Sequence, residues 1–224
     1  MTVSRSSKRQ LVESRLVAVA QECFAQHGYA GVSVDDIAAS AGVSKQGLLY
    51  YFASKELLYR RVFNDVLDTW VQNLSELADP RLTPREALER YVTQKLQFSF
   101  DNPTGSRLFA QEIMAQAPMC AADIKAKLVP TFRAESALLE QWMERGEARR
   151  VPVPHLLFTV WAMTQTYADF AWQTRMLLGK KKLNSADFEQ ARDMILRMVE
   201  GALGLADAPP AAAPLRKKRR VAHS

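Results

Sequence analysis

The sequence is poor in the residues that usually build metal centres, disulfide frameworks and hydrolytic sites. It has only two cysteines, Cys23 and Cys120, and three histidines, His27, His155 and His223. The two cysteines lie far apart in sequence and the three histidines lie on separate segments, so no metal or catalytic constellation is evident. We therefore expect free, buried thiols, no metal, no cofactor and no enzymatic activity.

Long apolar runs are also missing. No stretch of about 18 uncharged apolar residues occurs, which argues against a membrane-spanning helix. The polar, basic start MTVSRSSKRQ is not followed by the apolar core of a signal peptide. Hydrophobic residues still make up 48% of the chain, enough for a buried core, so we expect a folded, cytoplasmic protein without a membrane partner.

Positive charge is concentrated at the two ends of the chain. Residues 1–61 hold 8 Lys/Arg against 5 Asp/Glu, residues 62–213 hold 17 against 19, and residues 214–224 hold 5 against none. This distribution is typical of a basic N-terminal module that meets a polyanion, followed by a near-neutral body and a basic tail.

Almost everything between the ends has the spacing of amphipathic helices. In RQLVESRLVAVAQECFAQHG the apolar residues recur every three or four positions. Ser33 then begins a short helix, Gly42 supplies a turn, and Ser44 caps a third helix, KQGLLYYF. Ser54 opens a long helix to about residue 77. The sequence predicts an all-α fold.

The second and third of these helices follow each other as in a helix-turn-helix unit. In such a unit the start of the second helix enters the major groove, which places Lys45, Gln46 and Gly47 near base edges or phosphates. The amide of Gln46 could pair with adenine, and the phenols of Tyr50 and Tyr51 could reach phosphate oxygens. Alternatively, the two tyrosines pack half-buried at the helix end.

The run IAASAGVSKQGLLYYFASKELLY resembles the DNA-binding signature of the TetR family of bacterial regulators. The resemblance implies an all-helical homodimer, with a small helix-turn-helix domain joined to a larger ligand-binding and dimerisation domain, and repression relieved by a small molecule. It places DNA contacts at Ser33, Ser44, Lys45, Gln46, Gly47, Tyr50, Tyr51 and Lys55. The chain has GLLYYF where the family commonly has TLYYHF. The phosphate contacts expected at Gly47 and Tyr51 therefore follow the family pattern less closely than the contact at Tyr50.

These observations divide the chain into four parts. We expect a flexible basic segment at 1–9, the DNA-binding domain at 10–60, the effector-binding and dimerisation domain at 61–206, and a disordered basic tail at 207–224. The tail either adds sequence-independent attraction for DNA phosphates or is a solvated end without a specific role.

The body resembles, within that family, the regulators of pyrimidine utilisation. The similar segments are SRLFAQEIMAQAP, SALLEQW and HLLFTVWAMTQTYADFAWQ. The resemblance implies uracil or thymine as the effector, and genes of pyrimidine metabolism as the target.

The residues of the body are compatible with such an effector. The segment 155–178 has few charges and no proline, which predicts one helix buried on most sides. Polar and aromatic side chains recur along it every four positions, and a glutamine amide offers the donor and acceptor that a pyrimidine dione needs. The predicted effector-binding residues are Trp70, Arg107, Gln111, Trp161, Gln165, Tyr167, Asp169 and Gln173. Alternatively, these polar groups are hydrogen-bonded within the core or at a subunit interface.

The last helix, at about 185–205, predicts a homodimer. Its apolar stripe could pair with the preceding long helix and with their copies in a second subunit; the stripe consists of Phe188, Ala191, Ile195, Met198, Val199 and Ala202. A symmetric dimer would read a pseudo-palindromic operator in double-stranded DNA. Two alternatives stay open: a repressor that answers to a purine, another heterocycle or a drug-like molecule, and a constitutive DNA-binding dimer with a filled core.

Overall fold

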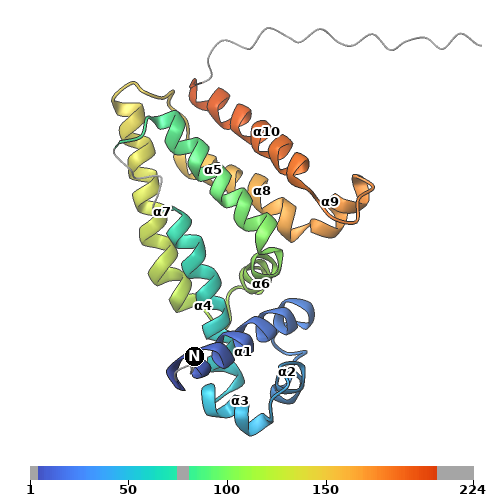
Figure 1. Cartoon of the computed structure of the whole chain (residues 1–224). Coiled ribbons are helices and arrows are strands. Elements are labelled where there is room, and N and C mark those ends of the chain that lie inside the picture. Colours follow the sequence, from blue (N-terminus) through green and yellow to red (C-terminus); the bar gives the residue numbers. More distant parts are fainter. Residues whose placement is uncertain (1–4, 75–80, 206–224) are drawn as a thin grey trace, which may run out of the picture.

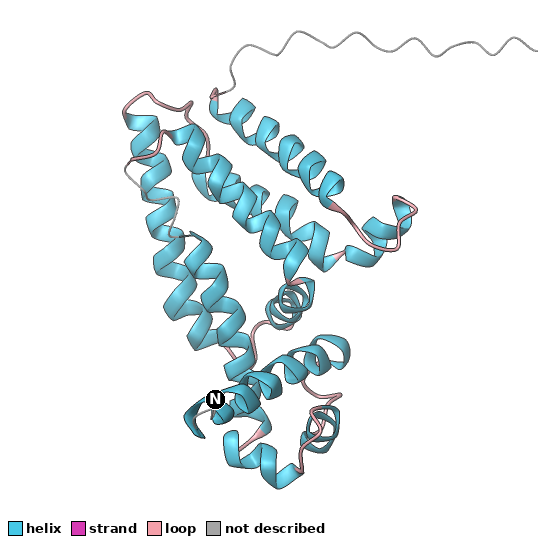
Figure 2. Ribbon diagram, in the orientation of Figure 1, coloured by secondary structure: helices cyan, strands magenta, loops and turns pink. Residues whose placement is uncertain are grey.

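The computed structural model describes residues 5–74 and 81–205, and every element of regular secondary structure in these ranges is a helix (Figures 1 and 2). The predicted all-α fold is confirmed. The helices are α1 (Arg5–His27), α2 (Val34–Ser40), α3 (Lys45–Tyr51), α4 (Lys55–Leu74), α5 (Pro84–Asp101), α6 (Pro103–Met114), α7 (Ala121–Glu144), α8 (Val153–Asp169), α9 (Ala171–Leu177) and α10 (Ser185–Leu203).

The predicted N-terminal caps are present. The Ser33 hydroxyl accepts a hydrogen bond from the backbone N–H of Asp36, whose carboxylate accepts from the Ser33 backbone N–H, which makes a capping box for α2. Ser44 accepts in the same way from the N–H of Gly47 at the start of α3. Gly42 has a φ of +64°, as the tight turn between α2 and α3 requires.

Helix α1 starts earlier than the sequence predicted. Residues 5–9, which we expected to be flexible together with the rest of 1–9, belong to the helix. No proline or glycine interrupts the segment, and its serine, lysine and arginine residues can all continue a helix. Residues 1–4 and the predicted disordered tail 207–224 lie outside the described residues.

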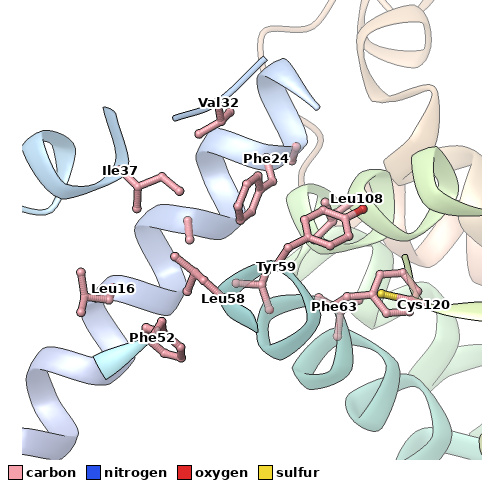
Figure 3. Close-up of a cluster of buried hydrophobic side chains, with 14 of the residues drawn as sticks. Leu16, Phe24, Val32, Ile37, Phe52, Leu58, Tyr59, Phe63, Leu108 and Cys120 are labelled. Carbon is pink, nitrogen blue, oxygen red and sulfur yellow. The ribbon is translucent and has the colours of Figure 1, made fainter. Parts of the chain in front are cut away.

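Helices α1 to α3 form one end of the molecule, and α4 runs from them into the body beside α7 (Figure 1). The apolar faces of these helices meet in a core in which Leu16, Phe24, Ile37 and Leu48 are completely buried (Figure 3). Phe52, the residue that follows the last turn of α3, is buried too. Because the Leu48 side chain points into the core, the opposite face of α3 is accessible to a ligand.

The apolar core of α1 to α3 continues into the body without a break. Tyr59 and Phe63 of α4 pack in the same cluster as Leu108 of α6 and Cys120 at the start of α7 (Figure 3). The domain boundary predicted at residue 60 therefore falls inside α4 and inside a shared cluster. A second cluster lies between α5, α7, α8 and α10.

The segment 155–178, predicted as one helix, is two. Helix α8 ends at Asp169, the chain turns at Phe170, and α9 follows with most of its side chains exposed. Periodicity could not show this break, because no proline or glycine marks it.

Part of the predicted apolar stripe of α10 is covered within the chain. Ala191, Ile195 and Val199 are buried against α5 and α8 of the same chain, so they are not available to a second subunit. Met198 of the same stripe lies on the outward face of α10 together with Met194, and the two side chains are 50% and 59% exposed.

Neither a membrane-spanning helix nor a metal-binding cluster occurs among the described residues. No described helix combines the length and the hydropathy that crossing a bilayer requires. Among residues 5–74 and 81–205, no three His, Cys, Asp or Glu side chains are grouped so that they could hold a metal ion. Cys120 is buried, Cys23 is half-buried, and both are free thiols.

Candidate DNA-binding face and ligand cavity

Helix α3 presents a polar face to solvent. Ser44, Lys45, Gln46 and Tyr50 are exposed, whereas Leu48, on the opposite side, is buried. Helical periodicity produces this division, because residues three or four positions apart share a face. The start of α3 is therefore accessible to a DNA groove, as the helix-turn-helix interpretation requires.

The charged and aromatic groups on this face are held only loosely. The Lys45 Nζ lies 2.8 Å from Asp35 Oδ2 in an exposed ion pair, which is weak enough to exchange for a phosphate. Tyr50 is 70% exposed, and its ring meets that of Tyr51 edge-on at 5.3 Å. The guanidinium of Arg9, on α1, lies 5.7 Å from the Tyr50 ring. Arg9 is a basic residue beside α3 that the sequence analysis did not single out.

Two other predicted DNA-contacting residues have structural roles. Ser33 is exposed and engaged in the capping box of α2. The Lys55 ammonium donates hydrogen bonds to the carbonyl oxygens of Tyr29 and Val32, each at 2.9 Å, and lies 4.2 Å from the centroid of the Tyr29 ring. Lys55 thus fixes the loop between α1 and α2. Tyr51 is half-buried against the core, and Gly47 is half-buried beside the Ser44 cap.

These placements predict different results for Lys45 and Lys55. We expect Lys55→Met to lower the free energy of unfolding by about 2 kcal/mol, because two hydrogen bonds from a charged donor are lost. Lys45→Ala should change it by less than about 0.5 kcal/mol, yet reduce the slope of log affinity against log salt for duplex DNA by about one. Urea unfolding and fluorescence anisotropy with non-specific duplex DNA measure the two effects. A slope flattened equally by Lys55→Met would instead place that ammonium on the phosphates.

A cavity of about 440 Å³ lies in the body between α4, α6, α7 and α8. Its size falls within the range of about 300–1,000 Å³ found for small-molecule sites. Most of its lining is apolar or aromatic, and its polar groups come from Arg107, Gln165 and Asp169. The complete lining is Trp70, Arg107, Phe109, Ala110, Ile113, Met114, Leu128, Trp161, Gln165, Asp169 and Phe170.

Five of the eight predicted effector-binding residues line this cavity: Trp70, Arg107, Trp161, Gln165 and Asp169. The other three lie elsewhere. Gln111 donates from Nε2 to the Ala25 carbonyl oxygen of α1, Tyr167 packs against the Phe100 ring, and Gln173 is exposed on α9. Gln173 was expected one turn beyond Asp169, but the turn at Phe170 removes it from the wall.

The sequence analysis missed the apolar part of the lining. Four of these residues belong to α6, namely Phe109, Ala110, Ile113 and Met114, and the others are Leu128 and Phe170. Ile113 and Met114 are exposed large apolar side chains. Nothing in the one-dimensional pattern of α6 separates a cavity wall from an ordinary apolar face.

The Asp169 carboxylate joins the end of α8 to α6. Its Oδ1 accepts a hydrogen bond of 2.7 Å from the Ser106 hydroxyl. Burial raises the pKa of Asp169, and the Ser106 hydrogen bond and the nearby Arg107 charge oppose that increase. The side chain therefore has a structural role in addition to its place in the cavity wall.

A charged side chain lies deeper in the body. Lys95 is only 6% exposed, and its Nζ lies 4.2 Å from the Trp70 ring centroid, 5.3 Å from that of Trp161 and 5.4 Å from that of Tyr91. Burial lowers the pKa of Lys95, and the nearby Glu135 carboxylate opposes this. Burial likewise raises the pKa of Glu135, which the Lys95 charge opposes. In the sequence, Lys95 interrupts the apolar stripe of α5, and this interruption could have identified it.

Helix α6 connects the cavity to the DNA-binding end. Its Glu112 carboxylate is buried and accepts hydrogen bonds from the Tyr59 hydroxyl of α4 at 2.8 Å and from the N–H groups of Met119 and Cys120 at 2.8 and 2.9 Å. Burial, and then the hydrogen bond to Glu112, raise the pKa of Tyr59. Helix α6 also contacts α1, through Gln111 and Ala25.

Comparison with known proteins divides the chain inside α4. The family model described as bacterial regulatory proteins, tetR family, matches residues 16–62, and the model described as the YcdC-like protein, C-terminal region, matches residues 63–206. The transcriptional regulator RutR of Escherichia coli is 35% identical over 198 residues, which cover 88% of this chain and 93% of RutR. The transcriptional activator FasR of Mycolicibacterium smegmatis is 31% identical over 141 residues, 62% of this chain and 64% of FasR.

Solved structures share the fold at lower identity. The ketosteroid transcriptional regulator KstR2 of Mycobacterium tuberculosis superposes with a TM-score of 0.70 at 20% identity, covering 91% of this chain and 96% of that one. AibR in complex with isovaleryl coenzyme A and operator DNA superposes with a TM-score of 0.64 at 19% identity, covering 84% and 97%.

Proposed function

The chain belongs to the TetR family of DNA-binding transcriptional regulators, and from this premise we propose that it is a homodimeric, ligand-responsive repressor in the cytoplasm. It leaves a pseudo-palindromic operator when uracil or thymine binds, and thereby controls genes of pyrimidine metabolism. The observation that carries the ligand assignment is the cavity wall, where two indoles stand beside the Gln165 amide. The similarity to RutR supports it independently.

The chemistry of the wall suits a planar heterocycle. The ring centroids of Trp70 and Trp161 lie 6.2 Å apart at an interplanar angle of 60°, so each can contact a flat ligand from a different side. Among the described residues the Gln165 side chain makes no hydrogen bond to the protein. Its amide carries both a donor and an acceptor, as the alternating groups of a pyrimidine dione require.

Helix α6 provides a route from ligand to DNA. One side of α6 lines the cavity, and the other side is bonded to α1 through Gln111 and to α4 through Glu112. A ligand that displaces α6 thus changes the orientation of α1 and α4, and with them the separation of two α3 helices in a dimer. By reciprocity, DNA must weaken the ligand as much as the ligand weakens DNA binding.

The dimer is proposed on the last helices of the body. The segment from α8 to α10 carries eight of the exposed large apolar side chains: Phe158, Phe170, Trp172, Met176, Leu177, Leu178, Met194 and Met198. A second copy would cover an apolar surface of this kind. The proposed interface therefore uses the outward face of α10, with Met194 and Met198, and leaves out the buried residues of the predicted stripe.

One observation favours a second candidate ligand. The cavity, at about 440 Å³, has room for a ligand larger than a single pyrimidine ring. A purine, another heterocycle or a drug-like molecule is therefore the alternative effector. A constitutive DNA-binding dimer is a weaker candidate, because its core would be expected to be filled.

Gln165→Ala tests the pyrimidine assignment. We expect uracil or thymine to bind the wild-type protein and to bind the variant at least about tenfold more weakly, because an unpaired ring amide would remain in a largely apolar site. Titration calorimetry measures both affinities, and Gln173→Ala, on exposed α9, is the matched control that should bind normally. Failure of both pyrimidines to bind the wild type would contradict the assignment. Equal ligand affinity with and without bound DNA would contradict the coupling.

A further inference from the structure

A small recess adjoins the large cavity. It has a volume of about 10 Å³, close to the space that a single water-sized group occupies. Trp70 and Gln165 line both the recess and the cavity, so these two side chains form the partition between them. The remaining walls of the recess are Lys95, Phe98, Ser99 and Thr164.

Most polar groups around the recess are already used within the protein. The Thr164 hydroxyl donates to backbone carbonyl oxygens one turn back in α8, and the Ser99 hydroxyl donates to the Lys95 carbonyl oxygen. In contrast, neither the Lys95 ammonium nor the Gln165 amide makes a hydrogen bond to another described residue. A buried ammonium has three N–H donors and no acceptor, so Lys95 can donate a hydrogen bond to an acceptor on a ligand.

The surroundings of Lys95 can stabilise its positive charge in the interior of the protein. The faces of Trp70, Trp161 and Tyr91 surround the ammonium, and Glu135 supplies the nearby negative charge. Trp161 Nε1 donates to the Tyr91 hydroxyl at 2.9 Å, and that hydroxyl lies 3.5 Å from Glu135 Oε2. The other carboxylate oxygen of Glu135 has no hydrogen-bond partner. A ligand that reaches Lys95 can therefore accept a hydrogen bond from the ammonium without having to supply the negative charge that balances it.

We propose that the cavity and the recess form one effector site, in which an acceptor oxygen on a planar ring enters the recess and accepts a hydrogen bond from Lys95. The ring then lies in the main cavity against Trp70 and Trp161, next to the Gln165 amide. This inference rests on the proposed role of the cavity as the effector site, and it defines the ligand class. The class contains rings that direct a carbonyl or carboxylate oxygen into the recess, and it excludes rings that would place an amino group in the recess.

The test uses a panel of planar probes and the full-length protein. Uracil, thymine and 2-pyridone carry neutral carbonyl oxygens, benzoate carries an anionic oxygen, and 2-aminopyridine and benzylamine carry donors instead. Calorimetry gives their affinities for the wild type, for Lys95→Met, and for Lys95→Met combined with Glu135→Leu. The double variant leaves no unpaired buried charge, so it remains informative if the single variant does not fold.

We expect at least one acceptor probe to bind the wild type, and every donor probe to bind at least about tenfold more weakly. Both variants should lose about 10- to 100-fold in affinity for the acceptor probe. Binding of benzoate or 2-pyridone without uracil or thymine would support the inference while contradicting the pyrimidine effector. A pyrimidine that binds both variants with full affinity would support the pyrimidine effector and contradict the inference. Equal binding of donor and acceptor probes, or no binding by any probe, would overturn the inference.

Discussion

Glu112→Ala is expected to lower the free energy of unfolding by about 3–5 kcal/mol. The buried carboxylate accepts three hydrogen bonds, and its removal leaves the donors on Tyr59, Met119 and Cys120 without a partner. It also holds the turn after α6, where Gln116 and Ala117 have left-handed φ values of +66° and +53°. Two such non-glycine residues in sequence store strain that only the surrounding bonds maintain.

Urea unfolding measures this loss, and two variants calibrate it. Tyr59→Phe removes one of the three bonds and should cost about 1–2 kcal/mol. Glu140→Ala, on the exposed side of α7, should cost less than about 0.5 kcal/mol. If Glu112→Ala lies within about 1 kcal/mol of the wild type, the carboxylate does not secure the junction of α4, α6 and α7.

Replacing Lys95 by Met together with Glu135 by Leu is expected to stabilise the protein by about 1–4 kcal/mol. Both charges are buried, and transfer of two ions out of water costs more than their attraction returns, particularly when Glu135 Oε1 has no hydrogen bond. Glu135→Leu alone should destabilise by about 3–5 kcal/mol at neutral pH, since it leaves the ammonium without its countercharge.

The same substitutions at a surface pair provide the control. Arg145 and Glu147 form an exposed ion pair, and Arg145→Met with Glu147→Leu should change stability by less than about 1 kcal/mol. A double Lys95 and Glu135 variant that is less stable than the wild type would mean that the buried pair serves stability. The expected gain would mean that the chain keeps the buried pair although the pair lowers the free energy of unfolding. A role of the pair in ligand binding would explain why it is kept.

The fold was largely readable from the sequence because local signals agree with one another at the DNA-binding end. Ser33 and Ser44 start helices, Gly42 makes the turn, and the apolar spacing around Leu48 selects the buried face. The break at Phe170 could not be predicted, because neither proline nor glycine marks it in the sequence. That α5 also covers the α10 stripe could not be predicted either, because periodicity identifies a buried face but not the helix that covers it.

The candidate sites divide in the same way. Trp161, Gln165 and Asp169 were found because helical spacing brings them to one face, and they line the cavity. Lys55 was assigned to DNA from the family resemblance, whereas its ammonium donates hydrogen bonds to carbonyl oxygens of the loop between α1 and α2. Lys95 was missed, although a lysine within an apolar stripe is itself a signal, since burial of an amine is costly without a specific environment.

The apolar cluster shared by the two parts of the chain limits how such a regulator can diversify. Leu108 and Cys120 of the body close the same cluster as Phe24 and Tyr59 of the DNA-binding end. A recombinant that joined residues 1–60 to the body of another regulator would keep one half of this cluster and lose the other. New ligand responses should therefore evolve by substitution within the cavity wall, with the DNA-binding end and α6 inherited together.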